Sequence, residues 1–477
     1  MPSRPDFVSR ALQRKPIAAD ENTGLRRTLG LPAVIALGVG AIVGAGLFSL
    51  TGIAAADYAG PAVILSLLLA AIVCGLTGLC YGEMAAMIPS AGSAYAYTYA
   101  SLGQLMAWII GWDLLLEYAV AGGTVAVSWS SYLQSLLHGF GIDLPRAIAK
   151  APAAGGLIDL PASCIVGLLT CLLLAGVRES AVVNAVIVVI KVAVILVLVG
   201  LGAFYVEARN YHPFIPDNTG AFGHFGWSGV LRGAGIVFFA YLGFDAVTTT
   251  AAETENPERA MPLGIIGALG ICTALYIAFA VVLTGVVNYQ QMHGDAAPVA
   301  TAIDRTPFAW LQIVVKLGII LGFTSVILVG LLGQGRIMFA MAQDRMLPPV
   351  FGKLHAARRT PWMAHLVMMA MCGLLAGFVP VEALGKMTSV GTLLAFAIVC
   401  GAVLVLRIRE PDRPRPFRVP GSPVTPLLGI ASCLLMILSL PWETWLRLAV
   451  WFALGLLVYA LYSGRRASAS LAEARRS

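Results

Sequence analysis

Charged residues are scarce in this chain of 477 amino acids. Asp, Glu, Lys and Arg together make up 12% of the sequence, against about 25% in a typical soluble protein. Hydrophobic residues make up 59%, so too few charged side chains remain to build the polar surface that a soluble protein of this length needs. The composition therefore predicts a multispan membrane protein. It argues against a soluble, a disulfide-built secreted or a nucleic-acid-binding protein.

The residues from which enzymes build metal and nucleophile sites are also sparse. The sequence contains no HExxH, P-loop or GxSxG motif and no cluster of His and Cys with metal-ligand spacing. All eight cysteines fall within apolar runs, where thiols act as small hydrophobic side chains. We therefore expect neither an enzyme nor a cofactor, a metal ion or a disulfide.

The net charge of +7 is concentrated in a few segments. Lys and Arg gather in residues 1–32, in the run from Arg407 to Arg418 and in residues 463–477, and each of these segments flanks an apolar run. This is the distribution of cytoplasmic loops under the positive-inside rule, so the charge predicts topology and not nucleic-acid binding. We expect residues 1–32, 407–423 and 463–477 to lie in the cytoplasm, without a cleavable signal peptide.

Twelve apolar stretches are each long enough to cross a bilayer as one helix. They lie at residues 33–56, 61–86, 104–136, 161–177, 182–205, 230–253, 263–287, 309–340, 362–379, 383–406, 424–441 and 444–462. An even number of spans places both termini on the same side, and the charge places that side in the cytoplasm. The sequence thus predicts a multi-pass protein of the cell (plasma or inner) membrane, with an extracellular loop at residues 206–229.

The first and the sixth of these stretches are both interrupted by glycine. The glycines are Gly38, Gly40, Gly44 and Gly46 in the first and Gly233, Gly235 and Gly243 in the sixth. Each stretch opens a block of five spans, residues 33–205 and 230–406, and residues 424–462 add two further spans. Glycine-interrupted helices at matching positions are typical of inverted-repeat transporters, whose site lies at mid-membrane. For the first stretch alone the alternative is helix packing, because Gly40 and Gly44 form a GxxxG face.

A broken helix inside a membrane leaves backbone groups without partners, and a zwitterionic ligand can supply them. We expect the ligand's carboxylate at the freed N–H groups of Gly44, Ala45 and Gly46, at the positive end of the following half-helix. The expected contacts of its ammonium are the carbonyls around Ile42, Val43, Phe239, Ala240 and Leu242. Because backbone groups meet both charges, this chemistry favours an amino acid over a sugar or an inorganic ion.

Two motifs at these breaks resemble a known family. Gly38-Val-Gly-Ala-Ile-Val-Gly-Ala-Gly-Leu-Phe48 resembles the first helix of the amino acid–polyamine–organocation permeases, and Phe238-Phe-Ala-Tyr-Leu-Gly-Phe-Asp245 resembles the sixth helix of their cationic amino acid transporter branch. The resemblance extends from about residue 24 to about residue 460. It implies an all-α, LeuT-type 5+5 inverted repeat with twelve transmembrane helices, of which helices 1 and 6 are broken at mid-membrane. Ala45 stands where Thr is common in the family, so one hydroxyl contact to the carboxylate is missing.

The resemblance also implies roles for two charged residues inside the spans. Lys191 lies roughly 10 Å deep in the fifth span at 1.5 Å per residue, where a lysine is costly and indicates function; a snorkelling side chain is the alternative. In the resembling branch a lysine at this place replaces the sodium ion of sodium-coupled relatives and contacts spans 1 and 8. Glu117 in the third span shares a helix face with Asp113, and it is implied to be a proton-coupling or substrate-facing acid; a structural partner of a polar neighbour is the alternative. We predict that Lys191 and Glu117 make transport proton-coupled and sodium-independent.

Two aromatic residues bear on the substrate. The motif places Phe239 at the edge of the site as a gate, with core packing as the alternative, and Phe323 in the eighth span is expected to fill part of the side-chain pocket. These residues favour a small neutral L-amino acid such as alanine, carried by alternating access through the lipid bilayer. Transport of arginine, lysine or ornithine is one alternative, and a substrate-sensing receptor with a transporter fold is another. Symport, uniport or exchange, a monomer or a homodimer, and the roles of Asp245, Glu83, Lys316 and Arg336 stay open.

Overall fold

The computed structural model describes residues 11–16, 29–90, 92–174, 181–251, 254–295, 297–304, 309–355, 360–464 and 466. Most of these residues are helical, and their only β-type pairing consists of two isolated bridges. Most of the two predicted cytoplasmic segments at the ends of the chain, residues 1–32 and 463–477, lies outside the described residues.

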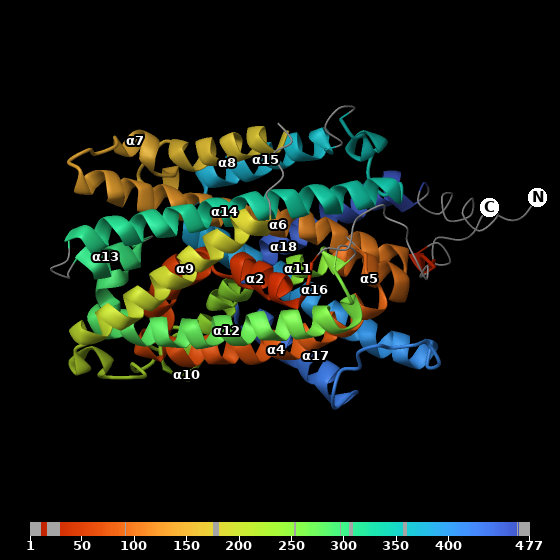
Figure 1. Ribbon diagram of the computed structural model, residues 1–477, viewed down its shortest axis with the longest axis horizontal. Coiled ribbons are helices and arrows are strands. Elements are labelled where there is room, and N and C mark those ends of the chain that lie inside the picture. Colours follow the sequence, from red (N-terminus) through yellow and green to blue (C-terminus); the bar gives the residue numbers. More distant parts are fainter. Residues whose placement is uncertain are drawn as a thin grey trace, which may run out of the picture.

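The longer helices lie side by side along the length of the molecule (Figure 1). The helices are α2 (Leu31–Ile42), α3 (Thr51–Ala54), α4 (Val63–Met87), α5 (Ser93–Ser101), α6 (Gln104–Gly139), α7 (Arg146–Ala149), α8 (Leu160–Leu174), α9 (Ala181–Gly202), α10 (Gly226–Val237), α11 (Phe244–Thr248), α12 (Pro257–Val286), α13 (Pro298–Asp304), α14 (Ala309–Gln343), α15 (Trp362–Phe378), α16 (Val381–Arg409), α17 (Val424–Ser439) and α18 (Trp442–Val458). Short helical turns join several of them.

The helices have the composition that a bilayer requires. Among the described residues, eight helical stretches are long and apolar enough to cross a membrane, and four shorter apolar helices accompany them, α2, α8, α15 and α17. The predicted apolar stretches overlap these helices within the described residues, and the first, residues 33–56, is divided between α2 and the helical stretch that begins at Gly46. Large hydrophobic side chains on α9, α17 and α18 are exposed, among them Val189, Leu438 and Leu454. Lipid, and not water, is the solvent that accommodates so much exposed apolar surface. The protein is therefore an all-α membrane protein.

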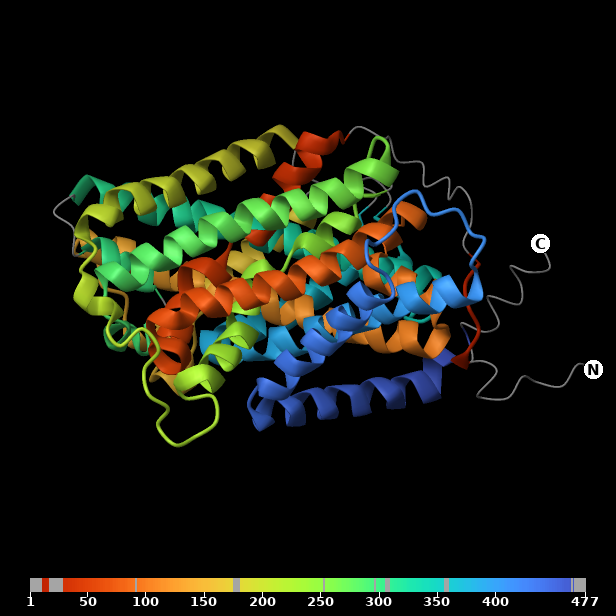
Figure 2. The same cartoon turned by 90° about the horizontal axis from the view of Figure 1, so that it is seen from below.

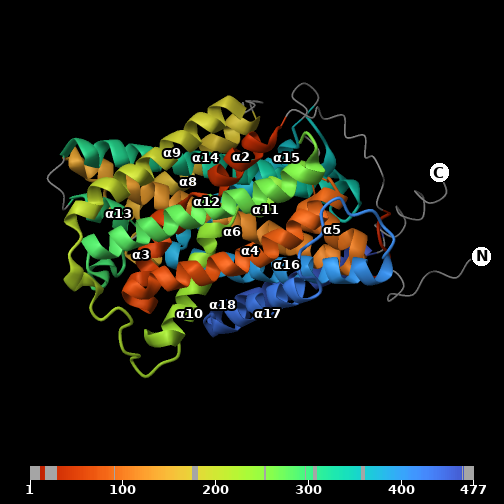
Figure 3. The same cartoon turned by 60° about the horizontal axis from the view of Figure 1, so that its bottom comes forward.

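Short helices occupy the centre of the bundle. In Figure 1, α2 and α11 lie in the middle of the molecule, with α6, α14, α9 and α12 around them. α4 packs against α12, and α6 packs against both α14 and α16. α17 and α18, the last two helices, lie together at one side of the bundle (Figures 2 and 3). The central helices are thus shielded from lipid by the longer ones, and irregular backbone can be tolerated there.

Ion pairs mark the two ends of the bundle. At one end, Arg14 lies 3.4 Å from Glu410 after α16, and Lys15 lies 3.4 Å from Asp344 after α14. At the other end, Lys316 at the start of α14 pairs with Asp304 at 2.8 Å. Residues 11–16 and the loop after α16 therefore lie at the same end of the bundle.

Candidate functional site

The first apolar stretch is not one continuous helix, because it is interrupted between α2 and the helical segment that follows. α2 ends at Ile42, Val43 has an extended conformation with φ −71° and ψ 104°, and helical structure resumes in η1 (Gly46–Leu50). The first N–H groups of a helix have no partner within that helix. The backbone N–H groups of Gly44, Ala45 and Gly46 stand at this helix start, and the sequence analysis selects the same three residues for a carboxylate.

A second interruption lies between α10 and α11. α10 ends at Val237, a tight turn η7 (Phe238–Tyr241) follows, and Leu242 is extended with ψ 146°. Gly243 then has φ +113°, a left-handed conformation that is accessible to glycine and costly for other residues. α11 begins at the next residue. The glycine is therefore required for the chain to change direction between the two half-helices.

The two interruptions pack backbone against backbone. A Cβ atom placed on Gly46 would lie 2.2 Å from the Cα atom of Ala240, and one on Gly243 would lie 2.7 Å from the carbonyl carbon of Ala41. No side-chain rotation can relieve either overlap, because both neighbours are main-chain atoms. Glycine thus brings the interrupted segment of one helix into direct contact with that of the other.

Two side chains from neighbouring helices bind carbonyls at these interruptions. Lys191 of α9, which is 1% exposed, donates from Nζ to the carbonyl oxygens of Gly40 at 2.8 Å and Val43 at 3.3 Å. The hydroxyl of Tyr276 on α12 lies 3.0 Å from the carbonyl oxygen of Ile42 and 2.9 Å from that of Ala240. Sequence reasoning missed Tyr276. The signal available was its place inside an apolar run, because a buried tyrosine hydroxyl needs a partner.

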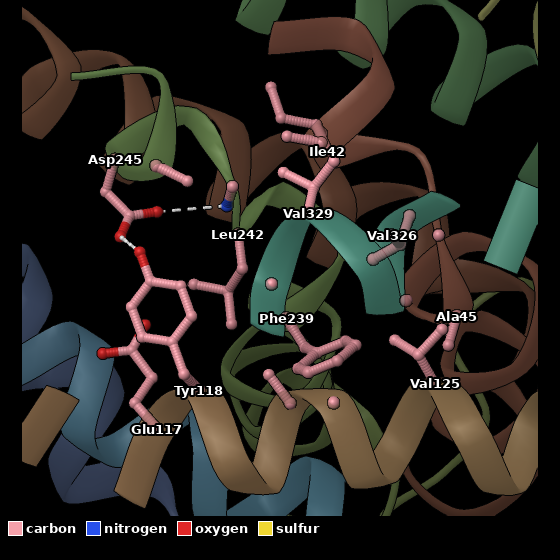
Figure 4. A pocket seen from close by; sticks show the side chains of 18 residues that line it. Ile42, Ala45, Glu117, Tyr118, Val125, Phe239, Leu242, Asp245, Val326 and Val329 are labelled. Atoms are coloured by element: carbon pink, nitrogen blue, oxygen red, sulfur yellow. Dashed lines mark hydrogen bonds between the residues drawn. The ribbon is translucent and has the colours of Figure 1, made fainter. Parts of the chain in front are cut away.

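A cavity of about 700 Å³, part of it open to solvent, lies beside the interruptions (Figure 4). The lining residues are Ala41, Ile42, Gly44, Ala45, Gly46, Glu117, Tyr118, Ala121, Gly122, Val125, Phe239, Leu242, Gly243, Asp245, Ala246, Val326, Val329 and Gly330. Seven of the predicted site residues are among them: Ile42, Gly44, Ala45, Gly46, Glu117, Phe239 and Leu242. Val43, Ala240, Lys191 and Phe323 are not.

The cavity has one polar and one aliphatic side. In Figure 4, Asp245, Tyr118 and Glu117 lie together on one side, and Val125, Val326 and Ala45 lie on the opposite side, with the ring of Phe239 between them. Asp245 accepts a hydrogen bond from the backbone N–H of Gly243 at 3.1 Å and one from the Tyr118 hydroxyl at 3.4 Å. Asp245 therefore stabilises the start of α11 and belongs to the cavity wall as well.

This membrane protein matches a known family over most of its length. A family profile described as "Amino acid permease" matches residues 29–462. The chain belongs to the amino acid permease family, within the amino acid–polyamine–organocation superfamily. This permease is 42% identical over 461 residues to the branched-chain amino acid permease BcaP of Bacillus subtilis, covering 96% of this chain and 97% of the relative.

Other relatives carry different names. The methylthioribose transporter of Bacillus subtilis is 42% identical over 463 residues, covering 96% of this permease and 98% of the relative. Cationic amino acid transporter 2 of Arabidopsis thaliana, described as vacuolar, is 38% identical over 390 residues, covering 81% of this permease and 61% of the relative. The relatives of this permease are therefore named for three kinds of substrate: branched-chain amino acids, methylthioribose and cationic amino acids.

Phe323 packs behind the wall of the cavity. Its ring centroid lies 6.0 Å from that of Phe48 and 5.6 Å from that of Tyr132, and it is fully buried. The Tyr132 hydroxyl donates to the carbonyl oxygen of Phe48 at 2.6 Å. This aromatic group stabilises the half-helix that follows Gly46. Val125 and Val326 occupy the places at the cavity that the sequence analysis gave to Phe323.

The charged residues whose roles the sequence left open lie outside the cavity lining, except for Asp245. Glu83 of α4 accepts hydrogen bonds from Arg407 Nε at 3.1 Å and from the backbone N–H of Val419 at 2.7 Å. Lys316 pairs with Asp304, and Arg336 is not among the lining residues. Glu83 therefore joins α4 to the loop after α16, and Lys316 joins α14 to α13.

Proposed function

We propose that this permease is a proton-coupled secondary transporter of neutral, aliphatic L-amino acids in the cell membrane. It crosses the membrane twelve times with both termini in the cytoplasm, as two inverted repeats at residues 33–205 and 230–406 followed by two further spans. The observation that carries the proposal is the cavity between the two helix interruptions, which combines free helix-start N–H groups with an aliphatic wall.

The backbone of the interruptions suits the two charges of an amino acid. The carboxylate accepts hydrogen bonds from the N–H groups of Gly44, Ala45 and Gly46 at the positive end of the helix that follows. The ammonium donates to carbonyls of the second interruption around Phe239 and Leu242. The carbonyls of Val43 and Ala240 already accept from Lys191 and Tyr276, so they hold the unwound segments in place. Backbone groups then bind both charges of the substrate, and no basic side chain is needed. No Lys, Arg or His is among the residues that line the cavity.

The aliphatic wall selects the side chain of the substrate. Val125 of α6 and Val326 of α14 face the cavity beside Ala45, and burial of a methyl or isobutyl group against them gains about 0.8 kcal/mol per CH₂. This extends the expected range from alanine to valine, leucine and isoleucine. Two relatives named branched-chain amino acid permeases, at 42% and 35% identity, support the extension.

Proton coupling is assigned to Lys191 and Glu117. The charged ammonium of Lys191 bridges the carbonyls of Gly40 and Val43 across the end of α2, the position that the family resemblance gives to a sodium ion in other branches. Loss of its proton removes the charge from this bridge and weakens its hold on the unwound segment. Glu117 lines the cavity, so it can exchange a proton with water there. Transport is then driven by protons and independent of sodium.

The polar side of the cavity favours a second candidate. Glu117 and Asp245 both line it, and a substrate guanidinium or ammonium group that extended past Phe239 would meet two carboxyl groups. Several relatives are named cationic amino acid transporters, at 35–38% identity. Asp245 is already engaged by Gly243 and Tyr118, which is why we rank neutral substrates first.

The test uses the purified full-length permease in liposomes, with labelled alanine, leucine and arginine, an imposed proton gradient and no sodium. We expect concentrative uptake of alanine and leucine that a protonophore abolishes. Uptake of arginine alone would show that the permease transports cationic amino acids and would refute the neutral substrate. Counterflow without accumulation would mean exchange, and binding without saturable transport would mean a sensor. In Lys191→Ala, accumulation driven by the proton gradient should be lost, and its persistence would refute the role of Lys191.

A further inference from the structure

Asp113 is a buried carboxyl group with no hydrogen-bond partner. It lies on α6, one helical turn before Glu117, and is 1% exposed. Neither Oδ1 nor Oδ2 has a donor within hydrogen-bond distance. The other buried aspartates differ from it: Asp245 accepts from Gly243 and Tyr118, and Asp159 accepts from Ser130 and Ala162.

α16 leaves room for this carboxyl group. A Cβ atom on Gly391 would lie 2.7 Å from Oδ1 and 3.2 Å from Cγ of Asp113, so a larger residue at that position would displace the carboxyl. The next residue of α16, Thr392, hydrogen-bonds to Glu117. The two acids therefore share one face of α6 against α16, and Glu117 alone of the two lines the cavity.

The surroundings of Asp113 favour the neutral acid over the carboxylate. An ionised carboxylate buried without donors or a cation pays its full desolvation cost, whereas the protonated form pays much less. The other titratable groups of this region are Glu117 itself, Asp245 on α11, and the tyrosines Tyr118, Tyr81 and Tyr97. None is a cation, so none offsets a negative charge on Asp113. Glu117 accepts a hydrogen bond from Thr392 and lines the cavity, so it is the member of the pair that can exchange a proton with water.

We propose that Asp113 binds the proton that is transported, and that Glu117 passes it between Asp113 and water in the cavity. The proton leaves Asp113, which becomes a carboxylate, and binds the Glu117 carboxylate. Glu117 then releases it to water and is again a carboxylate. In the state described here Asp113 holds the proton. The inference rests on proton coupling as the proposed function, and it adds the group that stores the proton.

The test compares three variants in liposomes by two readouts: counterflow of labelled substrate, and proton entry driven by substrate, followed with a pH-sensitive dye in the lumen. In Asp113→Asn we expect proton entry and accumulation to fall roughly tenfold or more, with counterflow retained within about threefold. Glu117→Gln should lose proton entry in the same way, and the double variant should lose no more than either single one. Asp159→Asn, an equally buried aspartate with its own donors, is the control and should behave as wild type.

Proton entry at the wild-type rate in Asp113→Asn would overturn the proposal, and so would loss of counterflow together with proton entry in well-folded protein. If Asp113→Asn does not yield folded protein, the Glu117→Gln variant tests whether Asp113 is protonated. With Asp159→Asn added, its infrared spectrum at about pH 6, where exposed carboxyl groups are ionised, should retain the carbonyl band of a protonated acid, and absence of that band would refute the proposal. Wild-type permease without substrate-driven proton entry would instead refute the proposed coupling, and the band in Glu117→Gln would still test whether Asp113 is protonated.

Discussion

Gly46→Ala is the substitution for which the structure predicts the largest effect on transport. The added methyl carbon would lie 2.2 Å from the Cα atom and 2.5 Å from the nitrogen of Ala240. Non-bonded carbon atoms prefer about 3.5–4.0 Å, so the two interrupted helices have to separate by more than about 1 Å. The atoms on the far side are main chain, so no change of rotamer relieves the overlap.

The cost of this separation follows from overpacking in protein interiors. Extra methyl groups in well-packed cores cost about 1–3 kcal/mol where side chains can adjust, and here they cannot, so we expect about 3 kcal/mol or more. Each 1.4 kcal/mol is a factor of ten in an equilibrium. The fraction of permease with the two interruptions in contact should therefore fall roughly a hundredfold, and substrate uptake in liposomes should fall with it.

Two matched substitutions make the comparison specific. Gly270→Ala on α12 has no atom within 4 Å of the new methyl group and should retain wild-type uptake. Gly44→Ala places its methyl 3.5 Å from Val326, an ordinary contact, and should keep the melting temperature in detergent within about 2 °C of wild type. Wild-type uptake by Gly46→Ala would refute the close contact between the two interruptions.

Three further predictions concern stability in detergent. Tyr276→Phe removes the hydroxyl shared by the carbonyls of Ile42 and Ala240 and should cost about 1–3 kcal/mol; an unchanged melting temperature would contradict this bridge. Glu83→Gln removes the charge that pairs with Arg407 and should cost about 3 kcal/mol, with KM for substrate unchanged because Glu83 lies outside the cavity lining. Burial raises the pKa of Asp159, at the entrance to α8, to about 6, against about 3.9 in the unfolded chain. The stability that the protonated Asp159 contributes is full below about pH 3.9 and is lost as pH rises through 6. The melting temperature of wild type should therefore fall between about pH 4 and 6 relative to Asp159→Asn, and parallel curves would refute this.

The helix interruptions could be predicted because glycine is selected there for a local reason. Gly243 has a left-handed φ of +113°, and Gly46 lies against the backbone of Ala240, and only glycine meets both requirements without strain. A glycine required in this way can be recognised in the sequence without knowledge of the helix that packs against it. Residues next to these glycines, among them Ile42, Ala45 and Leu242, line the cavity as predicted because they lie in the same two interruptions.

The residues that form the aliphatic wall of the cavity could not be identified from the sequence. Val125 and Val326 are two of many aliphatic residues in apolar helices, and only the packing of α6 and α14 against the interruptions turns these two toward the cavity. Phe323 lies close to Val326 in the sequence and was expected to fill the pocket, yet its ring packs on Phe48 and Tyr132. In a helix that is apolar on all sides, periodicity does not distinguish the face toward a cavity from the face toward a neighbouring helix.

The place of Lys191 bears directly on how a proton and a substrate can be coupled. Its ammonium binds the carbonyls of Gly40 and Val43 but does not line the cavity, whereas Gly44 and Gly46 do. One short unwound segment thus meets the lysine on one side and the cavity on the other. A ligand can shift an equilibrium only by binding one state better than another, and under the proposed mechanism both the positive charge of Lys191 and the substrate carboxylate favour the same geometry of this segment. The lysine and the substrate then need no contact, and by reciprocity substrate should raise the affinity of Lys191 for its own proton as much as that proton raises the affinity for substrate.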